Sequence, residues 1–191
     1  MTSYCAFQTK AGWIALVGCD GKLVRSTLPK ITLEAAIADV QAGLDGDSVE
    51  DRNALGNLPS RLERYFAGER VDFSDVEIDL DSQGPFHATV QRACQKIPYG
   101  TLMTYRDLAA ASGNSRAARA AGTAMAKNLV PIIVPCHRVV SSSGIGGFAL
   151  GLEWKRTLLQ LEGIADETSR AAGSGTVSLI AKEAKMPEGI F

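Results

Sequence analysis

One pair of neighbouring residues carries the side chains that nucleophilic chemistry needs. Cys136 and His137 are adjacent in the apolar run 132–140, in a chain that has only two histidines. A cysteine attacks as its thiolate, and an imidazole is well suited to remove the thiol proton at neutral pH. Because a lone cysteine in an apolar run is usually only a small core residue, the pair indicates a reactive thiol but does not establish one.

The spacing of this pair limits how the two side chains can cooperate. Adjacent side chains of an extended chain point to opposite faces. His137 can therefore serve Cys136 only if Pro135 bends the chain or a water molecule bridges the two side chains. The run Leu129–Val140 also contains Pro131, and two prolines predict a buried, irregular segment rather than a central strand or a helix.

The cysteine pattern indicates free thiols. The chain has four cysteines in 191 residues, with no C-x-x-C pair and no cluster of histidines: Cys5, Cys19, Cys94 and Cys136. This pattern does not make a disulfide framework and predicts no metal site.

The distribution of charge points to a local site for a polyanion. The net charge is −1, but residues 1–85 carry 8 basic and 14 acidic side chains, whereas residues 86–140 carry 7 basic and 1 acidic. The two segments thus have net charges of −6 and +6. A basic segment inside an otherwise acidic protein favours contact with a polyanion, although a solvated basic face is an equal alternative on charge alone.

The elements of residues 1–82 predict a small α+β domain. Asp20-Gly21 is a strong hairpin signal between two runs of strand-forming residues. Apolar spacing predicts two helices, the first stopped by Gly46. The predicted strands are Tyr4–Thr9, Gly12–Cys19, Lys22–Leu28 and the alternating segment Val71–Leu80, and the predicted helices are Thr32–Leu44 and Leu58–Ala67.

A mainly helical domain is predicted over residues 86–165, after a linker at 82–85. Its helices are Phe86–Ile97, Thr104–Ser112, Ser115–Lys127 and Gly151–Leu161, with a loop of small residues at 141–147. Thr104 with Asp107 resembles a capping box, and Ser115 is expected to cap the next helix. The pair of helices around Gly113 predicts a helix-turn-helix, and 166–191 is expected to be an appended or mobile extension. The fold class is therefore α+β.

The composition is that of a folded, soluble protein. Hydrophobic residues make up 46% of the chain and charged residues 21%, which excludes a disordered chain. No stretch has the roughly 20 apolar residues that span a bilayer, and the first residues lack a signal-peptide pattern. An intracellular protein is expected.

Three motifs in order resemble the O6-alkylguanine-DNA alkyltransferases. Pro135–Val140 (PCHRVV) resembles the active-site motif of that family, Ile97–Tyr105 resembles the entry to its helix-turn-helix, and Arg116–Gly122 resembles its recognition helix. Further matches follow in the family's order: Asn128, Gly146-Gly147-Phe148, Lys155, Leu158-Leu159 and Glu162-Gly163. The resemblance covers about residues 85–165, whereas the N-terminal domain matches only in size and style.

The resemblance implies a catalytic role for five residues. Cys136 would take the alkyl group from O6 of a damaged guanine in one displacement and form a stable thioether. His137 would accept the thiol proton through a water molecule, with Glu162 fixing the imidazole. Tyr105 would donate to N3 of the leaving guanine, and Asn128 would brace the bend before the active-site segment through side-chain bonds to the backbone.

The resemblance also implies that the protein binds double-stranded DNA and flips the damaged base out of the stack. Arg119 would enter the stack, and small residues on its helix would let the helix into the minor groove. Phosphate contacts by basic residues would supply affinity. The expected DNA-binding residues are Arg119, Tyr105, Ala117, Ala118, Ala120, Gly122, Arg116 and Lys127, with Arg106 as a further phosphate contact. No cofactor is expected, and a monomer in the cytoplasm, or in the nucleus of a eukaryote, is predicted.

The expected substrate pocket departs from the family pattern. Its predicted lining is Val139, Gly147, Phe148, Ala149 and Leu150. Leu150 stands where the family often has glycine, which predicts a narrower rim and slow reaction with bulky alkyl groups, unless Leu150 belongs to the core. Leu129 stands where the family has proline after Asn128, and the loop 141–147 is one residue shorter. Cys5 and Cys19 could match two zinc ligands of some members, but neither histidine has a counterpart, so zinc is not predicted.

Two other functions fit parts of the sequence. The first is a damage sensor or regulator that binds DNA through the helix-turn-helix, with Cys136 purely structural. Sensors that resemble the family replace the cysteine, and this chain keeps it. The second is a Cys-His hydrolase, which would turn over many times, whereas an alkyltransferase reacts once.

Overall fold

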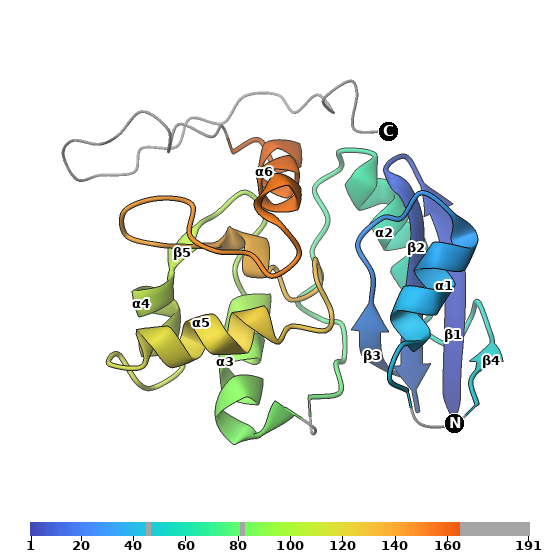
Figure 1. Ribbon diagram of the computed structural model, residues 1–191, viewed down its shortest axis with the longest axis horizontal. Coiled ribbons are helices and arrows are strands. Elements are labelled where there is room, and N and C mark those ends of the chain that lie inside the picture. Colours follow the sequence, from blue (N-terminus) through green and yellow to red (C-terminus); the bar gives the residue numbers. More distant parts are fainter. Residues whose placement is uncertain (45–46, 81–82, 165–191) are drawn as a thin grey trace. The chain divides into compact units, whose positions relative to one another are not determined.

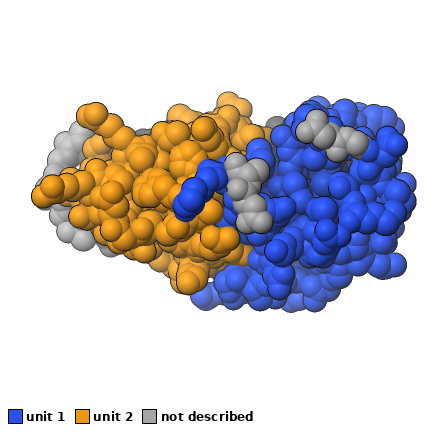
Figure 2. Space-filling model, turned by 90° about the horizontal axis from the view of Figure 1, so that it is seen from below, with its two compact units in different colours: residues 1–85, 129–134, 191 blue, residues 86–128, 135–190 orange. Residues whose placement is uncertain are grey.

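The computed structural model describes residues 1–44, 47–80 and 83–164, which form two compact units (Figure 2). The first unit comprises residues 1–85 together with 129–134, and the second comprises 86–128 and the residues from 135 onward. The chain therefore joins the first unit again after Asn128 and returns to the second unit at Pro135. No helix of the described residues is long and apolar enough to cross a membrane.

The first unit is built on a four-stranded sheet with the strand order β3-β2-β1-β4 (Figure 1). Its strands are β1 (Thr2–Thr9), β2 (Gly12–Cys19), β3 (Lys22–Ser26) and β4 (Val49–Glu50). β1, β2 and β3 are antiparallel neighbours, whereas β4 is parallel to β1. Asp20 and Gly21 both have positive φ, 51° and 80°, as a type I′ turn requires, and the predicted hairpin is confirmed.

Two helices complete the first unit, α1 (Leu33–Gln41) and α2 (Leu58–Phe66). The Thr32 hydroxyl caps the first turn of α1. Figure 1 shows α1 lying across the front of the sheet, where apolar residues of β2 and α1 form a buried cluster: Ala15, Val17, Ala36 and Val40. Gly43, with φ of 72°, follows the end of α1, so the helix stops before the predicted Gly46.

The predicted strand Val71–Leu80 is wrong. Its burial alternates at first, with Val71 and Phe73 buried, but a turn interrupts the segment at residues 74–75. The Asp72 carboxylate accepts the Ser74 amide at 3.0 Å and stabilises that turn. Only a single bridge joins the segment to β3, between Leu23 and Ile78.

The described part of the second unit contains four α-helices: α3 (Pro85–Gln95), α4 (Tyr105–Ala111), α5 (Ala118–Ala126) and α6 (Leu152–Leu161). They confirm the four predicted helices, and α4 packs against α5. Thr104 caps α4 by accepting the Asp107 amide at 3.1 Å, as predicted. The prediction that Ser115 caps α5 is wrong. Residues 115–117 belong to the connection, where the Asn114 side chain accepts the Arg116 amide, and α5 begins after Ala117 with no side-chain cap.

Residues 130–140 are buried and irregular, as predicted. Cys136–Arg138 form a single 3₁₀ turn, and β6 (Val139–Val140) pairs in parallel with β5 (Met103–Thr104). The sequence pattern does not predict these two strands, because two residues are too few to show alternation. The predicted extension 166–191 lies outside the described residues.

Candidate active site

Cys136 begins the 3₁₀ turn, and its side chain lines a pocket of the second unit. Pro135 precedes it with φ of −80° and ψ of 63°, so the chain bends just before the cysteine. The Asn128 side-chain amide Nδ2 donates to Cys136 Sγ at 3.0 Å. The resemblance predicts bonds from Asn128 to the backbone, and the structure adds a direct bond to the sulfur.

The His137 imidazole is fully buried beside Glu162. Its Nε2 lies 2.7 Å from Glu162 Oε1. Because an ionised carboxylate can only accept, this contact places the hydrogen on Nε2 and leaves the lone pair on Nδ1. His137 Nδ1 is buried without a hydrogen-bond partner among the described residues. It is therefore free to receive a proton through a water molecule.

Glu162 follows the last residue of α6 and is held on both oxygens. Arg138 donates to it twice, from Nε to Oε2 and from Nη2 to Oε1, each at 2.9 Å. The Gly100 amide donates to Oε2 at 3.0 Å. Arg138 is 5% exposed, so this is a buried bidentate ion pair, and such a pair fixes the carboxylate in place. The sequence reasoning did not include Arg138 among the site residues.

The motif around Gly100 holds the end of α6. The Tyr99 hydroxyl donates to the Leu161 carbonyl at 2.9 Å, and the Ile97 carbonyl accepts a hydrogen bond from Arg138 Nη1. Gly100 has φ of 72°, and a Cβ there would lie 3.3 Å from the Glu162 carbonyl oxygen. This motif, which the sequence places at the entry to α4, thus also positions Glu162.

Burial and charge set the protonation of these groups. Burial raises the pKa of Cys136 above its usual value, although the Asn128 hydrogen bond and the Lys155 charge oppose that rise. Burial also lowers the pKa of His137 below 6.5, against the pull of Glu162. Burial alone would raise the pKa of Glu162, but His137 and Arg138 outweigh it and hold that pKa well below its usual range. The imidazole is thus neutral and the thiol protonated, and the thiol requires a base before it can attack.

The pocket has a volume of about 120 Å³ and lies in the second unit. Its lining is Tyr105, Gly122, Met125, Ala126, Cys136, Gly147, Phe148 and Ala149. Gly147, Phe148 and Ala149 are among the residues predicted to line it, whereas Val139 and Leu150, also predicted, are not part of this lining. Val139 is fully buried in β6, and Leu150 is 45% exposed. Leu150 is therefore not a core residue, and the narrowing of the rim by its side chain stays a prediction.

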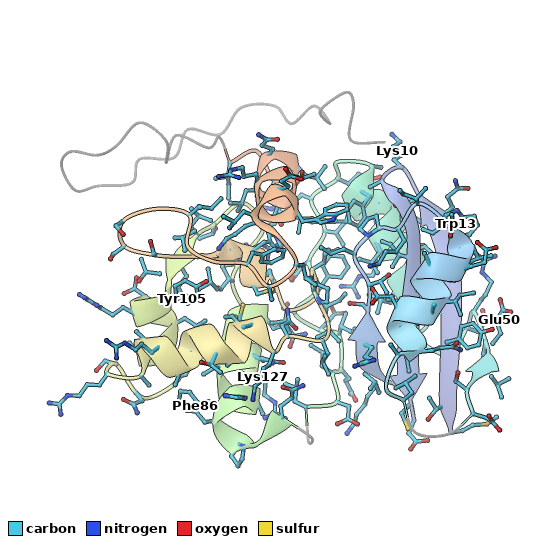
Figure 3. All side chains as sticks on the ribbon, viewed as in Figure 1. Lys10, Trp13, Glu50, Phe86, Tyr105 and Lys127 are labelled. Atoms are coloured by element: carbon cyan, nitrogen blue, oxygen red, sulfur yellow. The ribbon has the colours of Figure 1, made fainter. Side chains whose placement is uncertain are left out.

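Tyr105, the first residue of α4 (labelled in Figure 3), lines the pocket. Its hydroxyl donates to the Gly147 carbonyl at 3.2 Å. A Cβ on Gly122 would come within 3.9 Å of its ring, and one on Gly146 within 3.0 Å. A side chain on Gly146 would press on this ring, so glycine at this position leaves the room that the Tyr105 ring occupies.

Lys155 is a site residue that sequence reasoning noted only as part of the resemblance. It lies on α6 with no exposed surface, and its ammonium donates to the Val139 carbonyl at 2.6 Å and the Gly147 carbonyl at 3.0 Å. Burial lowers its pKa from 10.5 to about 8. A lysine on an amphipathic helix normally reads as a surface residue, so only the family pattern around it could have marked it.

The predicted DNA-binding residues lie on and around α4 and α5. Arg106, Arg116, Arg119 and Lys127 are exposed, and Lys127 follows the end of α5 (Figure 3). The small residues Ala117, Ala118, Ala120 and Gly122 are partly exposed, whereas Ala121 and Ala124 are buried in the core. The structure thus gives α5 one face of small and basic residues and one core face.

A protein-family model matches the described part of the second unit. Residues 85–164 match the model of the 6-O-methylguanine DNA methyltransferase, DNA binding domain. A methylated-DNA–protein-cysteine methyltransferase of Metallosphaera sedula is 36% identical over 163 residues, which cover 85% of this chain and 94% of that protein. One of Methanopyrus kandleri is 46% identical over 114 residues, or 60% of this chain and 85% of that protein.

Solved structures agree with these sequence matches. The crystal structure of Mycobacterium tuberculosis OGT in complex with DNA superposes with a TM-score of 0.68 and 35% identity, over 84% of this chain and 92% of that chain. The structure of O6-methylguanine-DNA methyltransferase from Pyrococcus kodakaraensis superposes with a TM-score of 0.63 and 28% identity, over 86% and 100% of the two chains. The likeness thus extends over both units, and the chain belongs to the family of methylated-DNA–protein-cysteine methyltransferases.

Proposed function

We propose that this protein repairs O6-alkylguanine in duplex DNA by transferring the alkyl group irreversibly to its own Cys136. The observation that carries this proposal is the arrangement at the pocket. Cys136 lines the pocket, and the neighbouring His137 is held by Glu162, with no hydrogen-bond partner for its Nδ1 within residues 1–44, 47–80 and 83–164. A protonated thiol beside a neutral, oriented base is the starting state that this displacement requires.

The reaction forms one bond and breaks one. The Cys136 proton passes through a water molecule to His137 Nδ1, and the thiolate sulfur attacks the alkyl carbon. The bond between that carbon and O6 breaks, and its electron pair leaves with the guanine. The proton given up by the thiol finally neutralises the guanine, while the Tyr105 hydroxyl donates to N3 and offsets the developing charge. The thioether has no proton to lose and no route back to the thiol, so each molecule reacts once.

The base must leave the helix before it can meet the sulfur, because a stacked guanine cannot reach a thiol inside a protein. The pocket beside α5 suits a single flipped base, and small residues on the outer face of α5 suit entry into the narrow minor groove. Arg119 is exposed on that helix and is our candidate for the side chain that fills the vacancy in the stack.

Intact-mass measurement with duplex DNA containing O6-methylguanine tests this proposal. We expect each protein molecule to gain the mass of one methyl group and peptide mapping to place it on Cys136. The Cys136→Ala variant should gain none but still bind the damaged duplex. Repeated turnover would favour a hydrolase, and a methyl group on Cys5, Cys19 or Cys94 would refute the assignment of Cys136.

Substitution of Arg119 should separate base flipping from chemistry. We expect Arg119→Ala to slow repair of duplex DNA by about tenfold or more, since an unfilled stack leaves the few kcal/mol of unstacking uncompensated. Transfer from the free alkylated base should be unchanged, because no stack is involved. Single-turnover rates on both substrates measure this split, and equal losses on the two would show that Arg119 does not act in flipping.

Lys127 provides a contrasting case. The Lys127→Ala variant should lose the same factor in affinity for damaged and for undamaged duplex. The slope of log K against the logarithm of the salt concentration should become shallower by about one unit. Titrations at several salt concentrations measure that slope. An unchanged slope would remove Lys127 from the phosphate contacts.

A further inference from the structure

A short loop connects the two residues that meet at the sulfur. Asn128 and Cys136 are joined by residues 129–135, and the Asn128 amide reaches Cys136 Sγ at 3.0 Å. That hydrogen bond lowers the pKa of a thiol which burial otherwise raises. Anything that fixes the shape of the loop therefore helps to set the reactivity of Cys136.

The loop has an unusual backbone at its centre. Ile132 has φ of 75°, although it is β-branched and only 1% exposed. A β-branched residue in this region is a true outlier and persists only where the surroundings hold it. The Val134 amide donates to the Val130 carbonyl at 2.9 Å across this turn, and Pro131 and Pro135 restrict φ on either side.

Ser26 holds the same loop from outside. As the last residue of β3, it donates from its backbone amide to the Leu129 carbonyl at 3.0 Å and from its hydroxyl to the Pro131 carbonyl at 3.2 Å. Ser26 is paired with Leu16 in the sheet, and the loop residues 129–134 belong to the same unit as that sheet. The sheet thus holds two backbone carbonyls of the loop that leads to Cys136.

We infer that Ser26 is a positioning residue for the chemistry at Cys136. By holding the carbonyls of Leu129 and Pro131, it keeps the strained turn in one conformation and so keeps the Asn128 amide on the sulfur. This role matters here because Leu129, unlike proline, leaves φ at the entrance of the loop unrestricted. The inference rests on the proposed function for its biological reaction, but the reactivity of the thiol can be measured without it.

The test compares three variants on thiol reactivity. Ser26→Ala removes the hydroxyl bond, and Ser26→Thr keeps a hydroxyl at the same place. Thr27→Val removes a neighbouring buried hydroxyl that accepts the Ala15 amide of β2 at 3.0 Å. The rate of carboxamidomethylation of Cys136 by iodoacetamide is followed against pH, with peptide mapping to separate the other cysteines. Methyl transfer from damaged duplex is measured in parallel.

We expect Ser26→Ala to lower the rate at Cys136 by between about twofold and tenfold, the usual worth of one hydrogen bond. The pH profile should also move to higher pH, because Sγ loses part of its contact with Asn128. Ser26→Thr should behave as the unchanged protein, and Thr27→Val should lose stability while keeping both rate and profile.

An unchanged profile in folded Ser26→Ala, or the same displacement in Thr27→Val, would overturn the inference. If Ser26→Ala does not fold, the double variant Ser26→Ala with Leu129→Pro is measured instead. Proline restricts φ at residue 129, so the pH profile of the double variant should match that of the unchanged protein. A displaced profile of the double variant would also overturn the inference. Absence of methyl transfer in the unchanged protein would refute the proposed function, while the iodoacetamide profiles would still judge Ser26.

Discussion

Glu162→Gln is expected to lower both the stability and the alkyl-transfer rate sharply. The change leaves Arg138 buried without its counter-charge, and removal of one partner from a buried pair costs about 3–5 kcal/mol. An amide at this place also no longer stabilises the imidazolium that forms when His137 takes the thiol proton, so we expect the transfer rate to fall on the order of 10²-fold. Urea unfolding and single-turnover kinetics measure the two effects.

The pH dependence of stability provides a second measure for Glu162. Its pKa is lower in the folded protein than its ordinary 4.5, so the unfolded chain binds the proton first as the pH falls. The stabilisation is therefore complete above 4.5 and declines as the pH falls below that value. Glu162→Gln should lack this part of the acid dependence. Glu153→Gln, an exposed carboxylate at the start of α6, is the control, and equal behaviour of the two variants would contradict the prediction.

Lys155→Met is expected to change how stability depends on alkaline pH. The folded pKa of Lys155 is about 8, whereas the ordinary value is 10.5. Between these values the unfolded chain holds a proton that the folded protein has lost, so the stability of the unchanged protein rises with pH there. The difference corresponds to roughly 3 kcal/mol at most.

The methionine variant has no such titration. It removes the Lys155 donor from the Val139 carbonyl, and it leaves the Gly147 carbonyl with the Tyr105 hydroxyl alone. A buried carbonyl that loses its donor costs about 1–3 kcal/mol. The gap in unfolding free energy between the unchanged protein and Lys155→Met should therefore widen from pH 8 to pH 10.5. Denaturant unfolding at several pH values measures it. Lys127→Met, at an exposed position, should show a constant gap. If the difference in unfolding free energy stays constant with pH for Lys155→Met, the pKa of Lys155 is not lowered by folding.

Local signals predicted much of the fold. The Asp20-Gly21 turn and the Thr104 cap were correct because each depends on residues within a few positions. The segment Val71–Leu80 failed because its alternation reflects burial only, while the local Asp72 turn breaks the strand. Ser115 failed as a cap for a similar reason, since the competing Asn114 side chain is equally suited to the turn.

The site was predictable only where a motif carries it. Residue types alone singled out the adjacent Cys136 and His137, whereas Glu162 came from the resemblance. The 2.7 Å contact between His137 and Glu162 brings together residues far apart in sequence. Arg138 and Lys155 are charged, so composition assigns them to the surface, yet both are buried with partners that no local pattern reveals. The sequence left open whether Leu150 belongs to the core, because the side on which a loop residue faces depends on tertiary packing.

The carbonyl of Gly147 accepts from two donors, the Tyr105 hydroxyl and the Lys155 ammonium. In the proposed reaction Tyr105 must turn towards the incoming base. Its departure leaves the carbonyl still bound by Lys155, so no buried acceptor is stranded at the moment of substrate entry. The Tyr105 hydroxyl can thus exchange the Gly147 carbonyl for an acceptor on the base. The free-energy barrier to entry of the base then does not include the cost of an unsatisfied buried carbonyl. The two donors on the Gly147 carbonyl thus allow the pocket to take up the base with this carbonyl still hydrogen-bonded.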